Sequence, residues 1–406
     1  MKKMRKRFKE FLNNTERVDL KIIIVLTFLC LFGCMMVYSA SSYVCATSAD
    51  FFYDDAYLLK KQILFIILGI VSIVILVNLD YHIFYWIGWG IFGINVILIL
   101  LLKTPLGVEA NGAVRWLNFG VVQLHVGEMS KMLLILFLAF IIAKHGKSTK
   151  DWKNVFKIWI YAGILAAMIL IISSNLSSCL IMLMITYGMT FIWSNTQKFH
   201  LVVVAVVAVL VSTFLIYIYY NLPDPETANN MGYQMRRILG WMDPEKYKDV
   251  FSNQILQSLY AVGSGGLFGK GLGKSMQKLG KIPEPQNDMI FAIICEELGI
   301  FGGIIVLILM GYLILQIVRV AISAKDLFGA MIAVGVALHF SFQTIVNVAV
   351  SLNVFPNTGV SLPFISYGGS ALLVMFSEVG LVLSVRRYRV LRDFEKQIKN
   401  ERIRMR

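Results

Sequence analysis

The chain has 406 residues, of which 58% are hydrophobic and 15% are charged, and it carries a formal net charge of +14. With a mean hydropathy of +0.72, this composition excludes an ordinary soluble domain and indicates an integral membrane protein. Basic residues that flank apolar runs usually mark cytoplasmic segments and contact anionic lipid headgroups, so no nucleic-acid partner is expected.

Ten apolar runs predict ten transmembrane helices, so the expected fold class is an all-α polytopic membrane protein. Several runs are shorter than the roughly 20 residues that a bilayer requires, so their boundaries are approximate. The runs cover residues 21–40, 62–79, 83–102, 130–143, 157–173, 177–194, 200–220, 288–318, 328–352 and 370–385.

Basic residues predict the orientation of these spans. They crowd before the first run and again between the fourth and fifth, and such segments stay in the cytoplasm. With ten spans both termini are then cytoplasmic, and residues 1–20 and 386–406 form basic tails around a transmembrane domain at 21–385. The first segment is too basic, and the run after it too long, for a cleaved signal peptide, so we expect the chain to retain it.

The segment between the seventh and eighth runs, residues 221–287, is too long for a simple connector and should form a large extracellular loop. Its glycines and basic residues suit an anionic headgroup, although a flexible amphipathic loop fits the composition equally well. Its Gly-x-Gly pattern lacks the strand and helix of a nucleotide-binding loop. The residues concerned are Gly263, Gly265, Gly266, Gly269, Gly271, Gly273, Arg236, Arg237, Lys270, Lys274 and Lys278.

The five cysteines predict neither a disulfide framework nor a metal site. Their spacing does not match a zinc site, and four of them lie within or at the edge of apolar runs, where cysteine packs as a small hydrophobe. They are Cys30, Cys34, Cys45, Cys179 and Cys295.

Asp288 lies where the large loop runs into the eighth apolar run, and an ionisable group at such a place is costly and usually functional. The structural alternative is an acid that complements the dipole at a helix N-terminus. Glu296 and Glu297 lie deeper on the same helix and point in other directions. We expect them to form ion pairs inside the bundle, for instance with Lys131, which sits one turn from Glu128.

A second interruption precedes the last run. Pro356, Pro363 and the Gly368–Gly369 pair bracket Ser366 and Tyr367, a pattern that breaks a helix at membrane depth. Broken backbone is tolerated there only against protein or a cavity, so this segment is expected to line a cavity. A simple tight outward turn is the alternative that the spacing also allows.

The second half of the chain resembles the SEDS family of polytopic cell-shape, division and sporulation proteins (FtsW, RodA and SpoVE-like). The closing part of the resemblance contains Gln343, Asn347 and the run Leu362-Pro-Phe-Ile-Ser-Tyr-Gly-Gly-Ser370, with Met289 in place of the usual Phe. The earlier matching positions are Gln254, Ser258, Ala261, Gly265, Gly266, Gly269, Gly271, Gly273, Pro283, Glu284, Asp288, Ile290, Phe291, Ala292, Glu296, Glu297, Leu298 and Gly299.

The first half resembles the family more loosely. Gly112-Ala-Val-Arg-Trp116, Glu128 and Lys131 match its polar motifs. His125, Val126 and Gly127 depart from the Gln-Pro-Ser of the family, Ser174-Asn-Leu-Ser-Ser178 replaces Pro-Asp-Leu-Gly-Thr, and Gln234 stands where Arg is frequent. These departures put in doubt any role for those particular positions.

The resemblance implies a peptidoglycan glycosyltransferase of the bacterial cytoplasmic membrane that polymerises lipid II at the outer face, with a class B penicillin-binding protein as partner. The Thr358-Gly-Val-Ser-Leu-Pro363 variant and the basic tails favour the division or sporulation branch over elongation. Asp288 would be the general base for the acceptor hydroxyl. A divalent cation (Mg or Mn) could assist the pyrophosphate, but no ligand cluster in the sequence indicates one. The residues expected to bind substrate are Arg115, Arg237, Lys270, Lys274, Ser366 and Tyr367.

Two other classes of function stay open at the level of sequence. A transporter that flips the same lipid would use buried polar groups along a path through both leaflets. A scaffold that only docks a partner predicts that replacing Asp288 by Asn has no effect. The polar groups available to a transporter are Glu128, Lys131, Glu296, Glu297 and Glu378.

Overall fold

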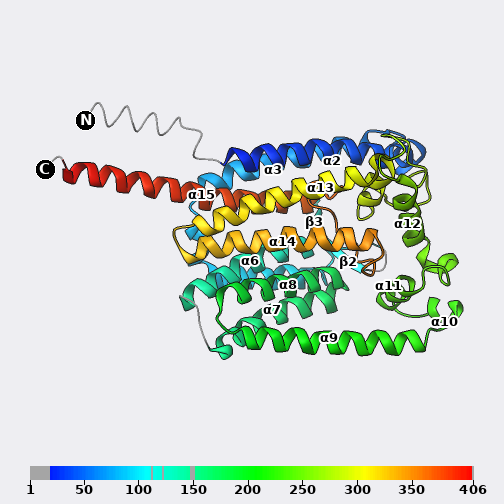
Figure 1. The fold of residues 1–406 in the computed structure, drawn as a ribbon, viewed down its shortest axis with the longest axis horizontal. Helices are drawn as coiled ribbons and strands as arrows, with labels where there is room; N and C mark the ends of the chain where they lie inside the picture. The colour runs from blue at the N-terminus through cyan, green and yellow to red at the C-terminus, as the bar shows by residue number, and fades with distance from the viewer. Residues whose placement is uncertain (1–18, 111–112, 121–122, 147–150, 405–406) are drawn as a thin grey trace.

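The structure is a computed structural model that describes residues 19–110, 113–120, 123–146 and 151–404. The predicted N-terminal basic tail therefore lies almost wholly outside the described residues. The helices run side by side in one bundle, and the C-terminal end of the chain projects from one end of it (Figure 1).

Every predicted apolar run is helical, with boundaries that differ from the prediction by several residues at some ends. The last helix extends beyond the expected boundary at 385. The bounds are α2 (Leu20–Thr47), α3 (Tyr57–Asn78), α4 (His82–Trp86) with α5 (Gly88–Leu101), α6 (Val126–His145), α7 (Trp152–Ser173), α8 (Leu176–Trp193), α9 (Gln197–Tyr220), α13 (Ile290–Ser323), α14 (Leu327–Ser351) and α15 (Gly369–Arg404).

Within the described part of the chain, nine helices are long and apolar enough to cross a membrane. The third predicted span is the exception, because its helix is interrupted at Ile87 and divided into α4 and α5. The two pieces together cover the length of the predicted run. The expectation of an all-α polytopic membrane protein with about ten spans is therefore confirmed.

Side-chain caps explain where several of these helices begin. The side chains of Asp19, Asp151, Asn175 and Asp326 each accept a hydrogen bond from a backbone N–H in the first turn of the helix that follows. Those N–H groups have no partner within the helix, so a cap residue of this kind stabilises the start of the helix.

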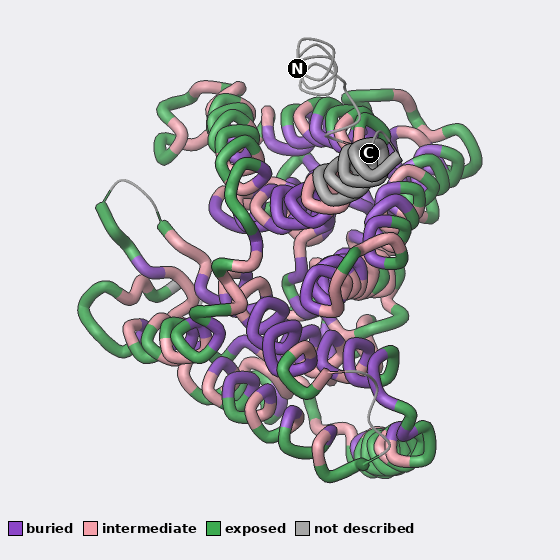
Figure 2. The backbone as a smooth tube through the Cα atoms, turned by 90° about the vertical axis from the view of Figure 1, so that its left-hand side faces the viewer, coloured by how far each residue is buried: buried purple, intermediate pink, exposed green. Residues whose placement is uncertain are grey.

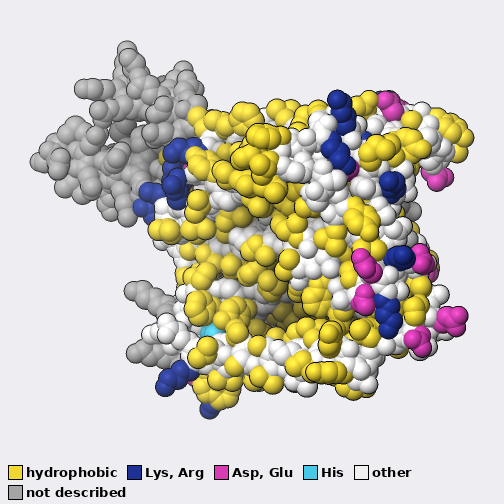
Figure 3. Space-filling view, turned by 45° about the vertical axis from the view of Figure 1, so that its right-hand side comes forward, with side chains coloured by type: hydrophobic (Ala, Val, Ile, Leu, Met, Phe, Trp, Pro, Cys, Tyr) yellow, Lys and Arg dark blue, Asp and Glu magenta, His cyan; other side chains and the backbone are white. Residues whose placement is uncertain are grey.

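Apolar side chains cover the outside of the bundle as well as its interior. Hydrophobic residues occupy the middle of the surface in Figure 3, and charged residues gather toward its two ends. Buried residues are concentrated in the helices at the middle of the bundle (Figure 2). In the most apolar stretch of α6, 83% of the residues are buried, against 6% in α9. An exposed apolar helix such as α9 is stable in lipid, where its surface needs no protein partner.

A small antiparallel sheet lies between α5 and α6, which the all-helical expectation did not include. Its strands are β1 (Gly107–Ala110), β2 (Ala113–Asn118) and β3 (Gln123–His125), in that order. Trp116 on β2 pairs with His125 on β3, so the sheet joins Arg115 and Trp116 to the start of α6.

The large segment after α9 contains four short helical pieces rather than an irregular loop. They are α10 (Pro225–Asn229), α11 (Tyr233–Met242), a π-helical turn (Lys248–Ser252) and α12 (Asn253–Gly265). They lie at the end of the bundle opposite the end of α15 (Figure 1), which we call the loop end.

The Gly-rich stretch after α12 packs directly against α13 at a kink. Gly299, with φ of +71°, interrupts α13, and the backbone N–H groups of Lys270 and Gly271 donate to the carbonyls of Glu296 and Glu297, both at 2.9 Å. The N–H of Ile300 in turn donates to the carbonyl of Gly266 at 3.0 Å. Two of the amides expected for an anionic headgroup are therefore used in this crossing.

A polar stripe on α14 connects the elements of the loop end. His339, Gln343, Asn347 and Ser351 recur every four residues, so they lie on one face of the helix, and all four are fully buried. Buried polar groups in an apolar bundle require partners, and each of these residues contacts a different neighbouring segment. The stripe therefore holds together segments that are far apart in sequence.

Candidate active site

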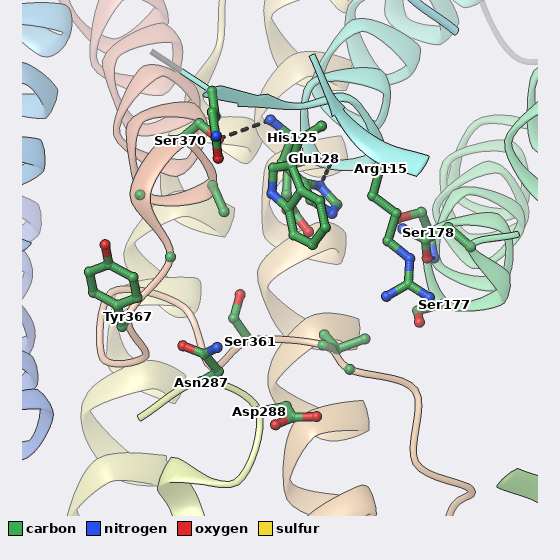
Figure 4. A pocket seen from close by; sticks show the side chains of 18 of the residues that line it. Arg115, His125, Glu128, Ser177, Ser178, Asn287, Asp288, Ser361, Tyr367 and Ser370 are labelled. Carbon is green, nitrogen blue, oxygen red and sulfur yellow. Dashed lines mark hydrogen bonds between the residues drawn. The ribbon is translucent and has the colours of Figure 1, made fainter. Parts of the chain in front are cut away.

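A cavity of about 570 Å³ opens at the loop end, between the spans and the short helices. Its walls come from β2 and the start of α6, from α8, from α11, from the turn before α13, and from the segment that joins α14 to α15 (Figure 4). The polar side chains of its lining include Arg115, Glu128, Lys131, Tyr233, Arg237, Glu284, Asn287, Asp288 and Tyr367.

Asp288 lies two residues before α13, half-buried at the wall of this cavity. Asn347 of the α14 stripe fixes its backbone, because the side-chain amide of Asn347 donates to the carbonyls of Asp288 at 2.8 Å and Val360 at 2.7 Å. Burial raises the pKa of the Asp288 carboxyl above its ordinary value, and the positive charge of Arg237 opposes that rise. The carboxyl thus belongs to the wall of the cavity rather than to the body of the helix.

Two arginines flank the ring of Tyr233 near this carboxyl. The guanidinium of Arg237 lies 4.3 Å from the ring centroid and that of Arg115 lies 5.9 Å from it. Arg237 also donates to the Tyr233 hydroxyl and, at 3.0 Å, to the carbonyl of Asn357. A Cβ added at Gly359 would lie about 4 Å from both Arg237 and Asp288, so the cation and the carboxylate face the same space.

Lys131 and Glu128 also line the cavity and bind each other. The Lys131 ammonium donates to Glu128 at 2.8 Å and to Gln343 of the stripe at 2.9 Å. Deeper in the bundle, His339 contacts both oxygens of Glu378 at 2.9 Å. These charged groups are buried in partnered arrangements, as the low dielectric of the interior requires.

Glu296 and Glu297 do form ion pairs, but the suggested pairing with Lys131 is wrong. Lys270 contacts Glu296 at 2.7 Å, and Lys278 contacts Glu297 at 2.8 Å. Both lysines come from the Gly-rich stretch, which the crossing at Gly299 brings onto α13. Lys131 is unavailable because it belongs to the Glu128 pair on α6.

The remaining predicted substrate ligands divide between the cavity and its surroundings. Tyr367 lines the cavity, whereas Lys270, Lys274 and Ser366 do not. The hydroxyl of Ser366 accepts a hydrogen bond from the N–H of Leu362 at 2.7 Å, which fixes the turn before α15. Substrate binding by Lys270, Lys274 and Ser366 stays a prediction that this cavity does not support.

Several cavity residues were not assigned a role from the sequence. His125, Asn175, Ser177 and Ser178 lie at positions where the chain departs from the family motifs, and all four line the cavity (Figure 4). Ser177 donates to the carbonyl of Thr358, which joins α8 to the opposite wall. Asn175, Ser177 and Ser178 lie at the boundary between the predicted spans at 157–173 and 177–194, and this boundary was the sequence signal that could have identified them.

The geometry places the Asp288 carboxyl and several cations around a single polar space, in which the carboxylate of Glu128 is already paired with Lys131. A carboxyl whose pKa is raised by burial is a stronger proton acceptor than an exposed one, and arginine side chains match the oxygens of a phosphate group. The arrangement therefore suits proton removal from a bound hydroxyl beside a phosphorylated leaving group.

Comparison with known proteins gives the family. The model of the FtsW, RodA and SpoVE family, described as "Cell cycle protein", matches residues 19–391. The stage V sporulation protein E of Bacillus subtilis is 34% identical over 376 residues, which cover 91% of this chain and 97% of that protein. A probable peptidoglycan glycosyltransferase FtsW of Geobacter metallireducens is also 34% identical, over 93% of this chain and 97% of its own length.

Solved structures of other proteins have the same fold as this chain. A chain from a study of how a peptidoglycan synthase complex coordinates polymerization and crosslinking superposes with a TM-score of 0.74 and 25% identity, over 92% of this chain and 98% of that one. The rod shape determining protein RodA of Thermus thermophilus has the same fold, with a TM-score of 0.65 and 23% identity over 92% of this chain and 97% of its own. The chain therefore belongs to the FtsW/RodA/SpoVE family, also called SEDS.

Proposed function

We propose that this chain polymerises lipid II into glycan strands and that Asp288 is the general base of the reaction. The single observation that carries this proposal is the position of the Asp288 carboxyl, half-buried in a polar cavity that also holds Arg115 and Arg237. At the level of reaction class, the chain is a peptidoglycan glycosyltransferase, because it matches proteins of that name over nine-tenths of its length.

The chemistry requires one base and several cations. The acceptor sugar hydroxyl attacks the anomeric carbon of the donor, a new carbon–oxygen bond forms there, and the bond to the lipid pyrophosphate breaks with its electron pair leaving on phosphate oxygen. The hydroxyl proton passes to the Asp288 carboxylate. Inversion at the anomeric carbon needs no second carboxylate as nucleophile, which agrees with one reacting carboxylate in the cavity wall.

The negative charge that develops on the pyrophosphate needs compensation. Arg115 and Arg237 face the cavity from different elements, and a planar guanidinium can bind two phosphate oxygens at once. Lys131 lines the same cavity from α6. Their shared placement supports these residues as ligands of the leaving group.

A divalent cation was left open by the sequence. The described residues contain no group of three or more His, Cys, Asp or Glu side chains that could hold a metal ion.

The membrane setting of the reaction follows from the positive-inside rule. The loop end, which carries the cavity, is placed at the outer face of the bacterial cytoplasmic membrane, with both termini in the cytoplasm. The division or sporulation branch and a class B penicillin-binding protein partner belong to the same proposal. They are supported by similarity to the sporulation protein of Bacillus subtilis and to the chain from a synthase complex.

The test is polymerisation of purified lipid II by the wild-type chain and by Asp288→Asn, with and without the transpeptidase partner. Loss of the base should lower the rate by a factor of about 10² to 10⁴. Asp224→Asn is the matched control, because Asp224 is an exposed carboxylate of the same large segment and does not line the cavity. Melting temperatures of both variants would show whether they fold. Glycan synthesis by Asp288→Asn at the wild-type rate would refute the role of the base.

The same variants distinguish a glycosyltransferase from the alternative, a transporter of the same lipid. Movement of a lipid between leaflets in vesicles does not need a base at Asp288, so a transporter should tolerate Asp288→Asn. It should instead depend on buried groups outside the cavity, such as Glu378. Lipid movement without glycan synthesis would favour that alternative.

A further inference from the structure

A second cavity of about 590 Å³ lies on the outer side of α12 and the π-helical turn before it. Its lining contains three amide side chains, Asn253, Gln254 and Gln257, and two aromatic residues, Phe251 and Tyr260. Tyr260 is 53% exposed, so the face of its ring is accessible from this cavity.

The charge of this second cavity differs from that of the first. Lys248 and Asp249 are its only charged lining residues among the described part of the chain, and their charges cancel. The first cavity, in contrast, is lined by four cationic side chains, Lys61, Arg115, Lys131 and Arg237, beside the carboxyls of Glu128, Glu284 and Asp288. The second cavity thus has no excess of cations for a phosphate, but it offers amide donors and acceptors beside an aromatic face.

The two cavities adjoin each other. Pro283 lines the second and the next residue, Glu284, lines the first. Gln254 of the second cavity accepts a hydrogen bond from Asn357 at 3.2 Å, and the carbonyl of Asn357 accepts one from Arg237 of the first cavity at 3.0 Å. A polymer that leaves or enters the first cavity at this wall would meet the second one next.

A neutral sugar fits this lining. Sugar hydroxyl groups exchange hydrogen bonds with amide side chains, and the C–H face of a sugar ring packs on an exposed aromatic ring. We propose that the second cavity is a subsite for the uncharged sugar backbone of the glycan strand, next to the site where bonds are made. This inference rests on the proposed function, which supplies the strand, and it adds the place where the strand is held.

The test measures binding of the strand apart from its synthesis. The probe is a lipid-free, uncrosslinked glycan oligosaccharide of the peptidoglycan repeat, titrated onto the purified full chain in lipid nanodiscs. The wild type should bind it without any polymerisation, because the probe carries no pyrophosphate leaving group. Tyr260→Ala should weaken binding about tenfold, and Gln257→Ala should weaken it in the same direction.

Tyr219→Ala is the matched control, since Tyr219 is 65% exposed on α9 and lines neither cavity. It should bind the probe like the wild type. In polymerisation assays, Tyr260→Ala should make shorter strands than the control, because a strand held less firmly dissociates earlier.

The outcomes separate this inference from the proposed function. Equal binding of the probe by the wild type, Tyr260→Ala and Gln257→Ala would overturn the subsite. The same result is expected if the cavity serves to bind a partner protein instead of the glycan strand. Polymerisation by the wild type together with that result would leave the proposed function intact. Binding that depends on Tyr260, in a chain that makes no polymer, would support the subsite and refute the proposed function.

Discussion

Asp288 experiences two opposing electrostatic influences. Burial disfavours its charged form and raises the pKa, while the guanidinium of Arg237 favours the charged form. A general base must be deprotonated before it acts, so the reaction should accelerate as the pH rises through the pKa of this carboxyl. The acid limb of the pH profile therefore reports the balance between burial and Arg237.

Arg237→Gln tests that balance. Without the positive charge the pKa of Asp288 should rise further, so the acid limb of the rate of lipid II consumption should move to higher pH. If Arg237 binds the pyrophosphate as proposed, the ratio kcat/KM should also fall by about tenfold or more. Arg237→Lys keeps the charge, and its acid limb should stay near that of the wild type. An acid limb that does not move in Arg237→Gln would contradict the assigned electrostatics.

At the scale of elements, the crossing of the Gly-rich stretch with α13 fixes this stretch of the loop end against the bundle. Lys270 and Lys278 each form an ion pair there with a buried glutamate, and the backbone hydrogen bonds described above hold the two segments together. Removing one member of a buried pair leaves an uncompensated charge, so the two pairs make this crossing sensitive to substitution. The kink at Gly299 allows the close approach.

Gly299→Ala should destabilise the crossing. Its φ of +71° is strained for alanine, and the added Cβ would lie 2.2 Å from the carbonyl oxygen of Leu267. We expect a loss of about 2 kcal/mol or more in the free energy of unfolding, visible as a lower melting temperature in detergent.

Gly263→Ala provides the comparison for this change. Gly263 lies in α12, and a Cβ added there meets no atom within 4 Å. Alanine favours a helix over glycine by up to about 1 kcal/mol, so this variant should melt at the wild-type temperature or slightly above it. Equal melting temperatures for the two variants would show that the crossing tolerates a Cβ at residue 299, contrary to this prediction.

At the scale of the whole molecule, the loop end and the opposite end of the bundle should lie on different sides of the membrane. The test is labelling of single cysteines by a thiol reagent that does not cross the bilayer, in a chain whose five native cysteines are replaced. Phe268→Cys, at an 80% exposed position of the loop end, should be labelled in intact cells.

Trp152→Cys is its counterpart at the first residue of α7, where the side chain is 51% exposed. It should be labelled only after the membrane is opened. The reverse pattern would place the cavity in the cytoplasm and remove the proposed access to lipid II at the outer face.

The sequence alone determined the class of fold, and it predicted Asp288 as the candidate base. In a bilayer every backbone group must be hydrogen-bonded within its segment, so hydropathy by itself identifies the spans. Asp288 was found because a carboxyl next to an apolar run is rare, and the family motif around it is long.

Only the tertiary structure decided which residues share a space. Lys270 instead of Lys131 meets Glu296 because the chain crossing at Gly299 brings together segments that are distant in sequence. Arg237 and Asp288 both face Gly359, in the segment between α14 and α15. Neither hydropathy nor helix periodicity describes such crossings. They depend on backbone contacts that glycine permits and on buried polar groups that must find partners, and those partners are set by the packing of the whole bundle.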